Sequence, residues 1–199
     1  MSPIALLSTQ KRRPATAAPA AKAPEPENIT ELDYHPREDA AQAPATSDNI
    51  YEPYRLDSIA IPGAKPHPSK LMQSAAMASV RPPVPTYRPH LPAKLIEDGI
   101  LSDAQLETII LAGEAHSQYL SGKWLLGENP HTLHPAKDDD DTAITYRKGF
   151  FIGDGTGCGK GREAAGIILD NWLKGRRRAV WISKSDKLIE DAQRDWSAL

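Results

Sequence analysis

The chain has 199 residues, with 24 lysines and arginines against 26 aspartates and glutamates, and a formal net charge of −2. This balance excludes an overall basic nucleic-acid-binding protein, although it leaves room for a local basic patch. The single cysteine argues against a disulfide scaffold and against a Cys-based zinc site, and we predict no metal-ligating residues. No apolar run approaches the roughly 18 residues that span a bilayer, so no association with a membrane is expected.

Residues 1–86 are predicted to form a disordered, Ala/Pro-rich arm. Sixteen of the 18 prolines lie at or before Pro92, and no apolar periodicity is sustained before Tyr87. Such a stretch buries too little apolar surface to offset the ordering of its backbone, which costs about 1–2 kcal/mol per residue. The apolar patch Ile50–Ile61 is interpreted either as a docking segment for a protein partner or as an ordinary linker, and residues 69–79 are a weak candidate for a short helix.

Ordered structure is expected from Tyr87, in a domain that occupies residues 87–199. Its first long helix is predicted to begin at Asp103, because Ser102 is a typical N-cap and Gln105 completes a capping box. Apolar residues then recur at helical spacing, so one face of this helix is predicted to be buried. These residues are Leu106, Ile109, Ile110 and Gly113.

A polar loop is predicted over residues 121–146, where His131 and His134 precede the acidic run Asp138–Asp141. Histidines beside carboxylates are possible metal ligands. Nothing in the local pattern predicts a rigid scaffold that would hold such ligands together, so a solvated acidic loop is the favoured interpretation.

The remaining residues predict an α/β fold with parallel βαβα connectivity. Residues 148–153 form a short apolar run that is typical of a buried strand, and residues 179–183 form a second one. Helices are predicted at 163–173, where Gly175 is well placed to end the helix, and at 186–196.

The glycine-rich segment 154–162 lies between the first of these strands and the helix that follows. Glycines leave room for backbone N–H groups to surround an anion, and the following helix directs its free N–H groups and positive dipole end at the same point. Lys160 adds a full positive charge. The pattern predicts a site for the phosphates of a nucleoside triphosphate, with a purely structural glycine turn as the alternative.

The segment departs from the strict phosphate-loop pattern G-x-x-x-x-G-K-[ST] at two positions. Asp154 replaces the first glycine, and Gly161 replaces the Ser or Thr that follows the lysine. Gly161 has no hydroxyl and therefore cannot bind Mg²⁺. The ligands of Mg²⁺ would then be water, Thr156 or an acidic residue elsewhere.

The segment GFFIGDGTGCGKGREAAGIILDNWLKGRRRAVWISKSDKLIEDAQRDW resembles the strawberry notch family, whose phosphate loop reads G-D-G-x-G-x-G-K-G-R. The glycine after the lysine is a feature of that family. Residues 101–116 also resemble the segment that precedes the loop in the family, with its L-S-x-x-Q-L-E core. The resemblance covers roughly residues 87–199.

The resemblance implies a partial RecA-like P-loop NTPase domain of a helicase-like ATPase of superfamily 2. Such a protein binds ATP and Mg²⁺ and acts on nucleic acid in transcription or DNA transactions. Lys160 is the expected catalytic residue, and Gln105 is similar to the glutamine that reads the adenine edge, with the capping box as its alternative role. The expected phosphate cradle consists of Asp154, Gly155, Thr156, Gly157, Cys158, Gly159, Lys160, Gly161 and Arg162.

Three further features are interpreted with alternatives. Residues 183–185 lie where similar proteins contact a nucleic-acid backbone, or they form a strand-to-helix turn with Ser185 as the N-cap. Arg176–Arg178 either touch phosphates or form a charged turn after a helix. The positive field of the loop is expected to lower the pKa of Cys158 without giving it a catalytic role.

Members of the family carry a D-E-A-H-like box and a second RecA-like domain downstream, and neither occurs before Leu199. The chain is therefore predicted to be the N-terminal portion of a larger protein, with weak nucleotide binding and no turnover of its own. A non-enzymatic interaction protein with a relic phosphate loop is the alternative. The Ala/Pro-rich arm and the loop favour a bacterial or phage-borne member, for which a cytoplasmic location is expected; a nuclear location is expected for a eukaryotic member.

Overall fold

A computed structural model describes residues 28–37, 50–56, 58–80, 82–129 and 131–199. The predicted disorder of residues 1–27 and 38–49 lies outside these described residues. The helices are α1 (Ala75–Ala78), α2 (Ala93–Glu97), α3 (Asp103–His116), α4 (Lys160–Leu173) and α5 (Lys187–Ser197), and none of these described helices is long and apolar enough to cross a membrane. The strands are β1 (Ile29–Glu31), β2 (His35–Pro36), β3 (Tyr51–Pro53), β4 (Ile59–Ala60), β5 (Met72–Ser74), β6 (His90–Pro92), β7 (Lys123–Leu126) and β8 (Leu133–Ala136).

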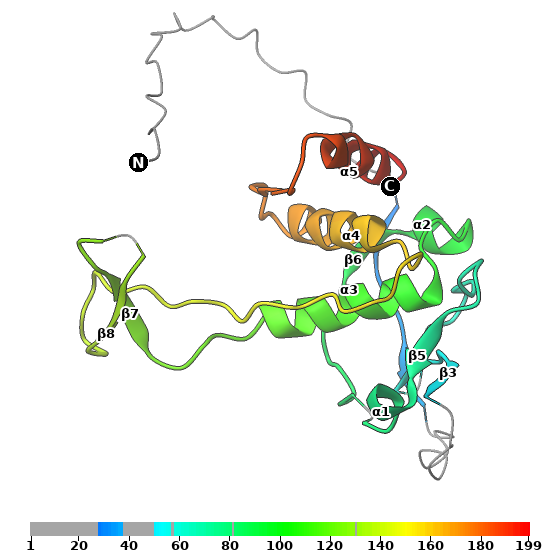
Figure 1. The fold of residues 1–199 in the computed structure, drawn as a ribbon, viewed down its shortest axis with the longest axis horizontal. Coiled ribbons are helices and arrows are strands. Elements are labelled where there is room, and N and C mark those ends of the chain that lie inside the picture. Colours follow the sequence, from blue (N-terminus) through cyan, green and yellow to red (C-terminus); the bar gives the residue numbers. More distant parts are fainter. Residues whose placement is uncertain (1–27, 38–49, 57, 81, 130) are drawn as a thin grey trace, which may run out of the picture.

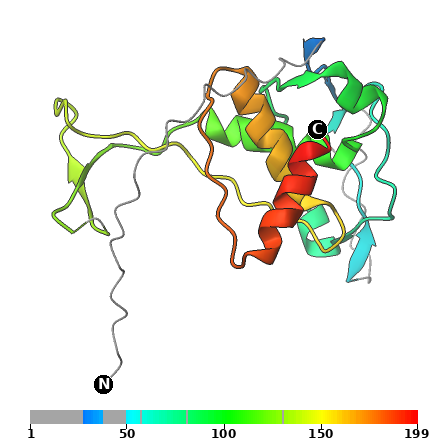
Figure 2. The same ribbon diagram turned by 90° about the horizontal axis from the view of Figure 1, so that it is seen from above.

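The three longer helices form the centre of the molecule, with α4 between α3 and α5 (Figures 1 and 2). The predicted face of α3, with Leu106, Ile109 and Ile110, is buried in a core that it shares with Leu169 of α4. α4 approaches α3 closely because Gly166 has no side chain: a Cβ there would lie 2.4 Å from Cδ1 of Ile109. The predicted burial of one face of α3 is confirmed.

The start of α3 follows the local sequence signal. Oγ of Ser102 accepts a hydrogen bond from the N–H of Gln105 at 3.4 Å, and Oε1 of Gln105 accepts one from the N–H of Ser102 at 3.0 Å. The predicted capping box is confirmed, and it satisfies two N–H groups that a helix end leaves without partners.

The C-terminus of α4 also lies where the sequence predicts. Gly175 adopts a φ of +89°, and the N–H of Arg176 donates to the carbonyl of Asn171 at 2.8 Å, as in a Schellman motif. α5 starts one residue later than predicted, because its N-cap is Asp186 and not Ser185.

The described strands pair only in antiparallel ladders, β1 with β6, β2 with β4, β3 with β5 and β7 with β8. The predicted parallel βαβα arrangement is therefore wrong. Residues 148–153 and 179–183 are described in full, and neither segment is a strand. Their apolar side chains are exposed, Phe151 at 88%, Val180 at 85% and Ile182 at 87%. An apolar run forms a strand only when a neighbouring strand satisfies its backbone, and no described segment forms a ladder with these two.

Segments upstream of Tyr87 contribute to the core, although the sequence predicts an arm there. Leu32, Tyr34 and Ile59 are buried in the same core as the helices. The hydroxyl of Tyr34 donates to the carbonyls of Pro85 and Tyr87, each at 2.9 Å, which ties this segment to the start of the predicted domain. These apolar residues are isolated in the sequence and show no period, so only tertiary contacts reveal their burial.

The loop predicted over residues 121–146 contains the hairpin β7–β8, which extends away from the helices (Figure 1). Two isolated bridges connect this part of the molecule to the chain that follows β8: Tyr119, which precedes the hairpin, pairs with Arg147, and Trp124 of β7 pairs with Ile144. The loop prediction is therefore wrong for β7 and β8.

Candidate functional site

The glycine-rich segment leads directly into α4. Gly157 and Gly159 adopt φ values of +92° and +82°, a left-handed conformation that favours glycine. Gly159 is the N-cap of α4, and no described side chain caps this helix. The N–H groups of Lys160 and Gly161 therefore have no partner within the helix, whereas that of Arg162 donates to the carbonyl of Gly159 at 2.8 Å.

α3 and α4 each have 14 residues but differ at their N-termini. The N–H groups at the start of α3 are occupied by the capping box. α4 opens onto the glycine loop, and no described side chain caps it, although the carboxylate of Asp195 lies beside Gly161; its positive dipole end attracts anions. An open helix N-terminus behind a glycine loop has the geometry to bind a phosphate.

The side chain of Lys160 lies across the loop. Its Nζ donates to the carbonyl oxygens of Asp154 and Gly155, each at 2.9 Å, and the residue is exposed to solvent. Phosphate oxygens carry more negative charge than carbonyl oxygens, so an incoming phosphate would outcompete these two carbonyls for the ammonium group.

The buried side chain of Gln105 connects the start of α3 to the loop. While Oε1 belongs to the capping box, Nε2 donates to the carbonyl of Cys158 at 3.0 Å. A Cβ at Gly159 would lie 2.4 Å from this Nε2, so the contact requires glycine there. The capping role is confirmed, and the role of Gln105 in reading adenine stays a prediction.

The two residues after Lys160 face other parts of the molecule. Gly161 packs against α5, where a Cβ would lie 2.0 Å from Oδ2 of Asp195. This contact gives a steric reason for glycine at the position where the general pattern has Ser or Thr. Arg162 donates from Nη1 to the carbonyl of Ile100 at 3.1 Å, so its guanidinium lies beside the turn between α2 and α3. Gly155 and Thr156 of the loop are exposed.

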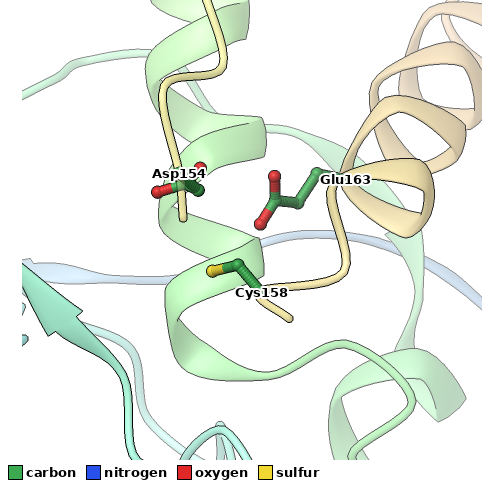
Figure 3. Close-up of side chains that lie close together, drawn as sticks. All are labelled: Asp154, Cys158 and Glu163. Atoms are coloured by element: carbon green, nitrogen blue, oxygen red, sulfur yellow. The ribbon is translucent and has the colours of Figure 1, made fainter. Parts of the chain in front are cut away.

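The side chains of Asp154 and Cys158 of the loop and of Glu163 of α4 lie close together (Figure 3). One ligand-type atom of each lies within 4.8 Å of the others. The packing of α4 on α3 also brings Thr108 to this cluster, where its Oγ1 donates to Oδ2 of Asp154 at 3.5 Å. Sequence reasoning missed Glu163, because an acidic residue in the first turn of a helix is also what the helix dipole alone favours.

Burial changes the protonation of this cluster. It raises the pKa of Glu163 to about 8, with a further contribution from Asp154. It also raises the pKa of Cys158 to about 12, with contributions from Asp154 and Glu163. The expected lowering of the Cys158 pKa is therefore wrong, because burial and two carboxylates outweigh the charge of Lys160. On α3, burial raises the pKa of Glu107 to about 7, again with a contribution from Asp154.

The other sequence candidates do not join this cluster. In the part of the chain that the structure describes, the histidines of residues 131–134 and the acidic run 138–141 form no group of metal-ligating atoms. In the basic turn after α4, Nη1 of Arg176 donates to Oδ1 of Asn171 at 2.8 Å. Residues 183–185 lie before α5, and their contact with nucleic acid stays a prediction.

The P-loop containing NTP hydrolase pore-1 family matches residues 66–199. The chain is 36% identical to Protein FORGETTER 1 of Arabidopsis thaliana over 150 residues, which are 75% of this chain and 10% of that protein. It is 41% identical to Protein strawberry notch of Drosophila melanogaster over 133 residues, 67% of this chain and 7% of that protein. It is 40% identical to Protein strawberry notch homolog 1 of Gallus gallus over 129 residues, 65% of this chain and 9% of that protein. No solved structure matches the chain.

The family match extends upstream of the predicted domain start, since it begins at residue 66 and not near residue 87. The chain spans between 7% and 10% of the length of these three relatives. All three come from eukaryotes, so they give no support to the bacterial or phage origin that the sequence favours.

Proposed function

Because the chain belongs to the strawberry notch family of P-loop containing NTP hydrolases, we propose that residues 154–162 bind the triphosphate of ATP. Membership of this family implies nucleotide binding; ATP as the nucleotide and the loop as its site are the proposal. The activity of the whole protein is likewise proposed, because the chain spans so little of its relatives. We infer a helicase-like ATPase that acts on nucleic acid in transcription or DNA transactions.

The observation that carries the proposal is the uncapped N-terminus of α4 behind the glycine loop. Gly157 and Gly159 adopt the left-handed conformation. This conformation turns the backbone of the loop around the N-terminus of α4. Lys160 stands at the same point with an exposed ammonium group. Backbone donors, a helix dipole and one full charge together suit the β- and γ-phosphates.

Mg²⁺ accompanies the nucleotide in this class of protein, and one exposed residue of the loop fits it. Gly161 supplies no hydroxyl, whereas Thr156 does and is exposed. Since Mg²⁺ takes oxygen ligands and keeps several waters, one hydroxyl beside the phosphates is an adequate protein ligand. When bound, the ion would neutralise charge on the phosphates. Water would complete its remaining positions.

The test compares binding of a fluorescent ATP analogue to the chain and to Lys160→Ala. A hydrogen bond to a charged group contributes about 1.5–3 kcal/mol, so the affinity should fall about tenfold or more. Lys137→Ala is the matched control, because Lys137 is an exposed lysine outside the loop, and it should bind as the unaltered chain does. Equal affinities of the two variants would refute the assignment of Lys160.

The same protein should show no turnover of ATP, because the described residues include only the phosphate-binding part of the expected machinery. Phosphate release is measured with and without nucleic acid. Hydrolysis that is stimulated by nucleic acid and lost in Lys160→Ala would contradict this expectation, while it would strengthen the assignment of the loop.

A non-enzymatic interaction protein is the second candidate, and exposed apolar residues favour it. The side chains of Phe151, Val180 and Ile182 are largely exposed. On α5, Leu188 and Ile189 each expose about half of their surface. Apolar surface of this extent is typical of a surface that binds another protein or another segment. If this alternative holds, Lys160→Ala leaves the function in cells unaltered.

A further inference from the structure

The buried carboxyl group of Glu163 has its polar partners only inside its own cluster in the described part of the molecule, at Asp154 and Cys158. The residue is 0% exposed, and neither of its oxygens accepts a hydrogen bond from a described group outside the cluster. The ammonium of Lys160, on the same turn of α4, donates to loop carbonyls instead. Burial and Asp154 raise the pKa of Glu163 to about 8, so the cluster keeps a proton near neutral pH, and a bound divalent cation would take the place of that proton.

The side chain of Glu163 is directed into the cluster with Asp154 and Cys158 (Figure 3). The ligand-type atoms of the three residues lie within 4.8 Å of one another. Around a zinc ion the bonds to sulfur and oxygen are about 2.0–2.3 Å, so two ligand atoms are at most about 4 Å apart. The three side chains must therefore move closer together when the ion binds, and Asp154, which is only partly buried, has the most room to do so.

Neighbouring groups hold two of the three residues in place. Nε2 of Gln105 donates to the carbonyl of Cys158 at 3.0 Å, which fixes the backbone of the loop next to the thiol. Oγ1 of Thr108 donates to Oδ2 of Asp154 at 3.5 Å. Such outer contacts orient ligands in protein metal sites. The arrangement is therefore built from two helices and the loop, and not from a flexible acidic surface.

The ligand set indicates the class of ion. Mg²⁺ and Ca²⁺ favour oxygen ligands alone, whereas a thiolate together with carboxylates suits Zn²⁺ and Co²⁺. Because the chain has a single cysteine, it cannot form a zinc site from several cysteines. A ligand set with two carboxylates, however, needs only one thiolate. We propose that Asp154, Cys158 and Glu163 bind a divalent ion of the zinc class, with a fourth position open to water.

Cobalt titration of the full chain tests the proposal without nucleotide, with a phosphine reductant to keep Cys158 reduced. One equivalent of Co²⁺ should bind with a near-ultraviolet thiolate-to-cobalt absorption band, and Zn²⁺ should displace it. Cys158→Ser should abolish the band, and Glu163→Gln should weaken binding about tenfold or more. Asp139→Asn, in the exposed acidic run, is the matched control and should bind Co²⁺ as the unaltered chain does.

Glu163→Gln replaces the carboxyl group with an amide of nearly the same shape, so circular dichroism should show an unaltered fold. Zn²⁺ should raise the melting temperature of the unaltered chain and not that of Glu163→Gln. The proposal is overturned if no thiolate band forms, or if Glu163→Gln binds Co²⁺ as tightly as the unaltered chain. Because no nucleotide is present, neither result depends on the proposed ATP binding.

Discussion

Gly157 and Gly159 lie two residues apart in the loop and require glycine for different reasons. Both have positive φ values, which side chains with a Cβ adopt at a cost. A Cβ at Gly159 would lie 2.4 Å from Nε2 of Gln105, whereas no described atom lies within 4 Å of one at Gly157. At Gly157 a side chain would therefore cause backbone strain alone. At Gly159 it would cause backbone strain and also a steric clash with Gln105.

Gly159→Ala should lower the free energy of unfolding more than Gly157→Ala. Left-handed backbone strain costs about 1–2 kcal/mol in each variant. Gly159→Ala also displaces Gln105 and breaks its hydrogen bond to the carbonyl of Cys158, a further loss of about 1 kcal/mol. Urea unfolding measures both variants, with Gly157→Ala as the control, and equal losses would contradict the contact with Gln105.

Glu107 should make the stability of the protein depend on pH. Its pKa is raised by burial from 4.5 to about 7, so the folded state holds the proton more tightly than the unfolded state. This contribution to stability is complete below about pH 4.5 and is lost as the pH rises through 7. Between pH 5 and pH 7 the unaltered chain should lose about 1 kcal/mol per pH unit relative to Glu107→Gln, whose amide does not titrate.

Glu114→Gln is the control with the opposite sign. Burial would raise the pKa of Glu114, but hydrogen bonds from Thr86 and Tyr87 outweigh it and lower the pKa below its ordinary value. Glu114 therefore stabilises the folded state above its unfolded pKa, and this stability is lost as the pH falls. Urea unfolding at pH 4, 5, 6 and 7 measures both variants; parallel trends in the two would contradict the assignment.

At the residue scale, local hydrogen bonds are predictable and the protonation of side chains is not. The capping box of Ser102 and Gln105 needs only neighbours in the sequence, and the prediction is confirmed. The pKa of Cys158 depends on burial and on Glu163. Glu163 lies in the first turn of α4 and contacts the loop from there. A sequence pattern contains no measure of that burial.

At the scale of elements, a buried carboxylate fixes α4 to residues 87–90, which lead into β6 and include its first residue. Asp170 accepts hydrogen bonds from the hydroxyl of Tyr87 at 2.5 Å and from the N–H of His90 at 2.7 Å. Nζ of Lys174 lies 3.5 Å from Oδ1 of Asp170 and donates to the carbonyl of Arg88 at 2.6 Å. The residues joined by these hydrogen bonds are 80 to 86 positions apart in the sequence.

Asp170→Asn should therefore destabilise the fold by about 1–3 kcal/mol, because the amide has one acceptor oxygen and cannot accept from both Tyr87 and His90 as the carboxylate does. Urea unfolding of Asp170→Asn, Tyr87→Phe and the double variant should give a coupling energy above about 0.5 kcal/mol. Asp191→Asn is the control: Asp191 pairs with Arg194 at 2.6 Å on the exposed face of α5, and its loss should cost less than about 1 kcal/mol. Additive losses for Asp170 and Tyr87 would rule out the direct contact.

The helices agree with their sequence patterns because helix hydrogen bonds join residues four apart. α3, α4 and α5 occur where periodicity and end signals predict them, with shifts of a few residues at the boundaries. The predicted strands at 148–153 and 179–183 are wrong, since pairing depends on a second segment elsewhere in the chain or in a partner.

At the scale of the whole molecule, the two segments predicted as buried strands contribute exposed apolar surface. Val180 and Ile182 should therefore add little to the stability of this chain. Ile182→Thr should change the free energy of unfolding by less than about 0.5 kcal/mol and reduce the binding of a dye that reports apolar surface.

Leu106→Ala is the control for that prediction, because Leu106 is fully buried in the core shared by α3 and α4. Its truncation should cost about 2–5 kcal/mol. Should Ile182→Thr cost as much as Leu106→Ala, Ile182 would have to be buried in solution.

The sequence by itself determined the three long helices, the capping box, the glycine loop before α4 and the family, because each depends on residues that are close along the chain. Only the tertiary structure decided that Leu32 and Ile59 join the core and that Gln105 holds the loop. It also decided that Asp154, Cys158 and Glu163 lie together, with Cys158 and Glu163 buried and Asp154 partly buried. Burial and contact between distant segments depend on how helices pack, and a local pattern carries no information about which surface will cover a residue.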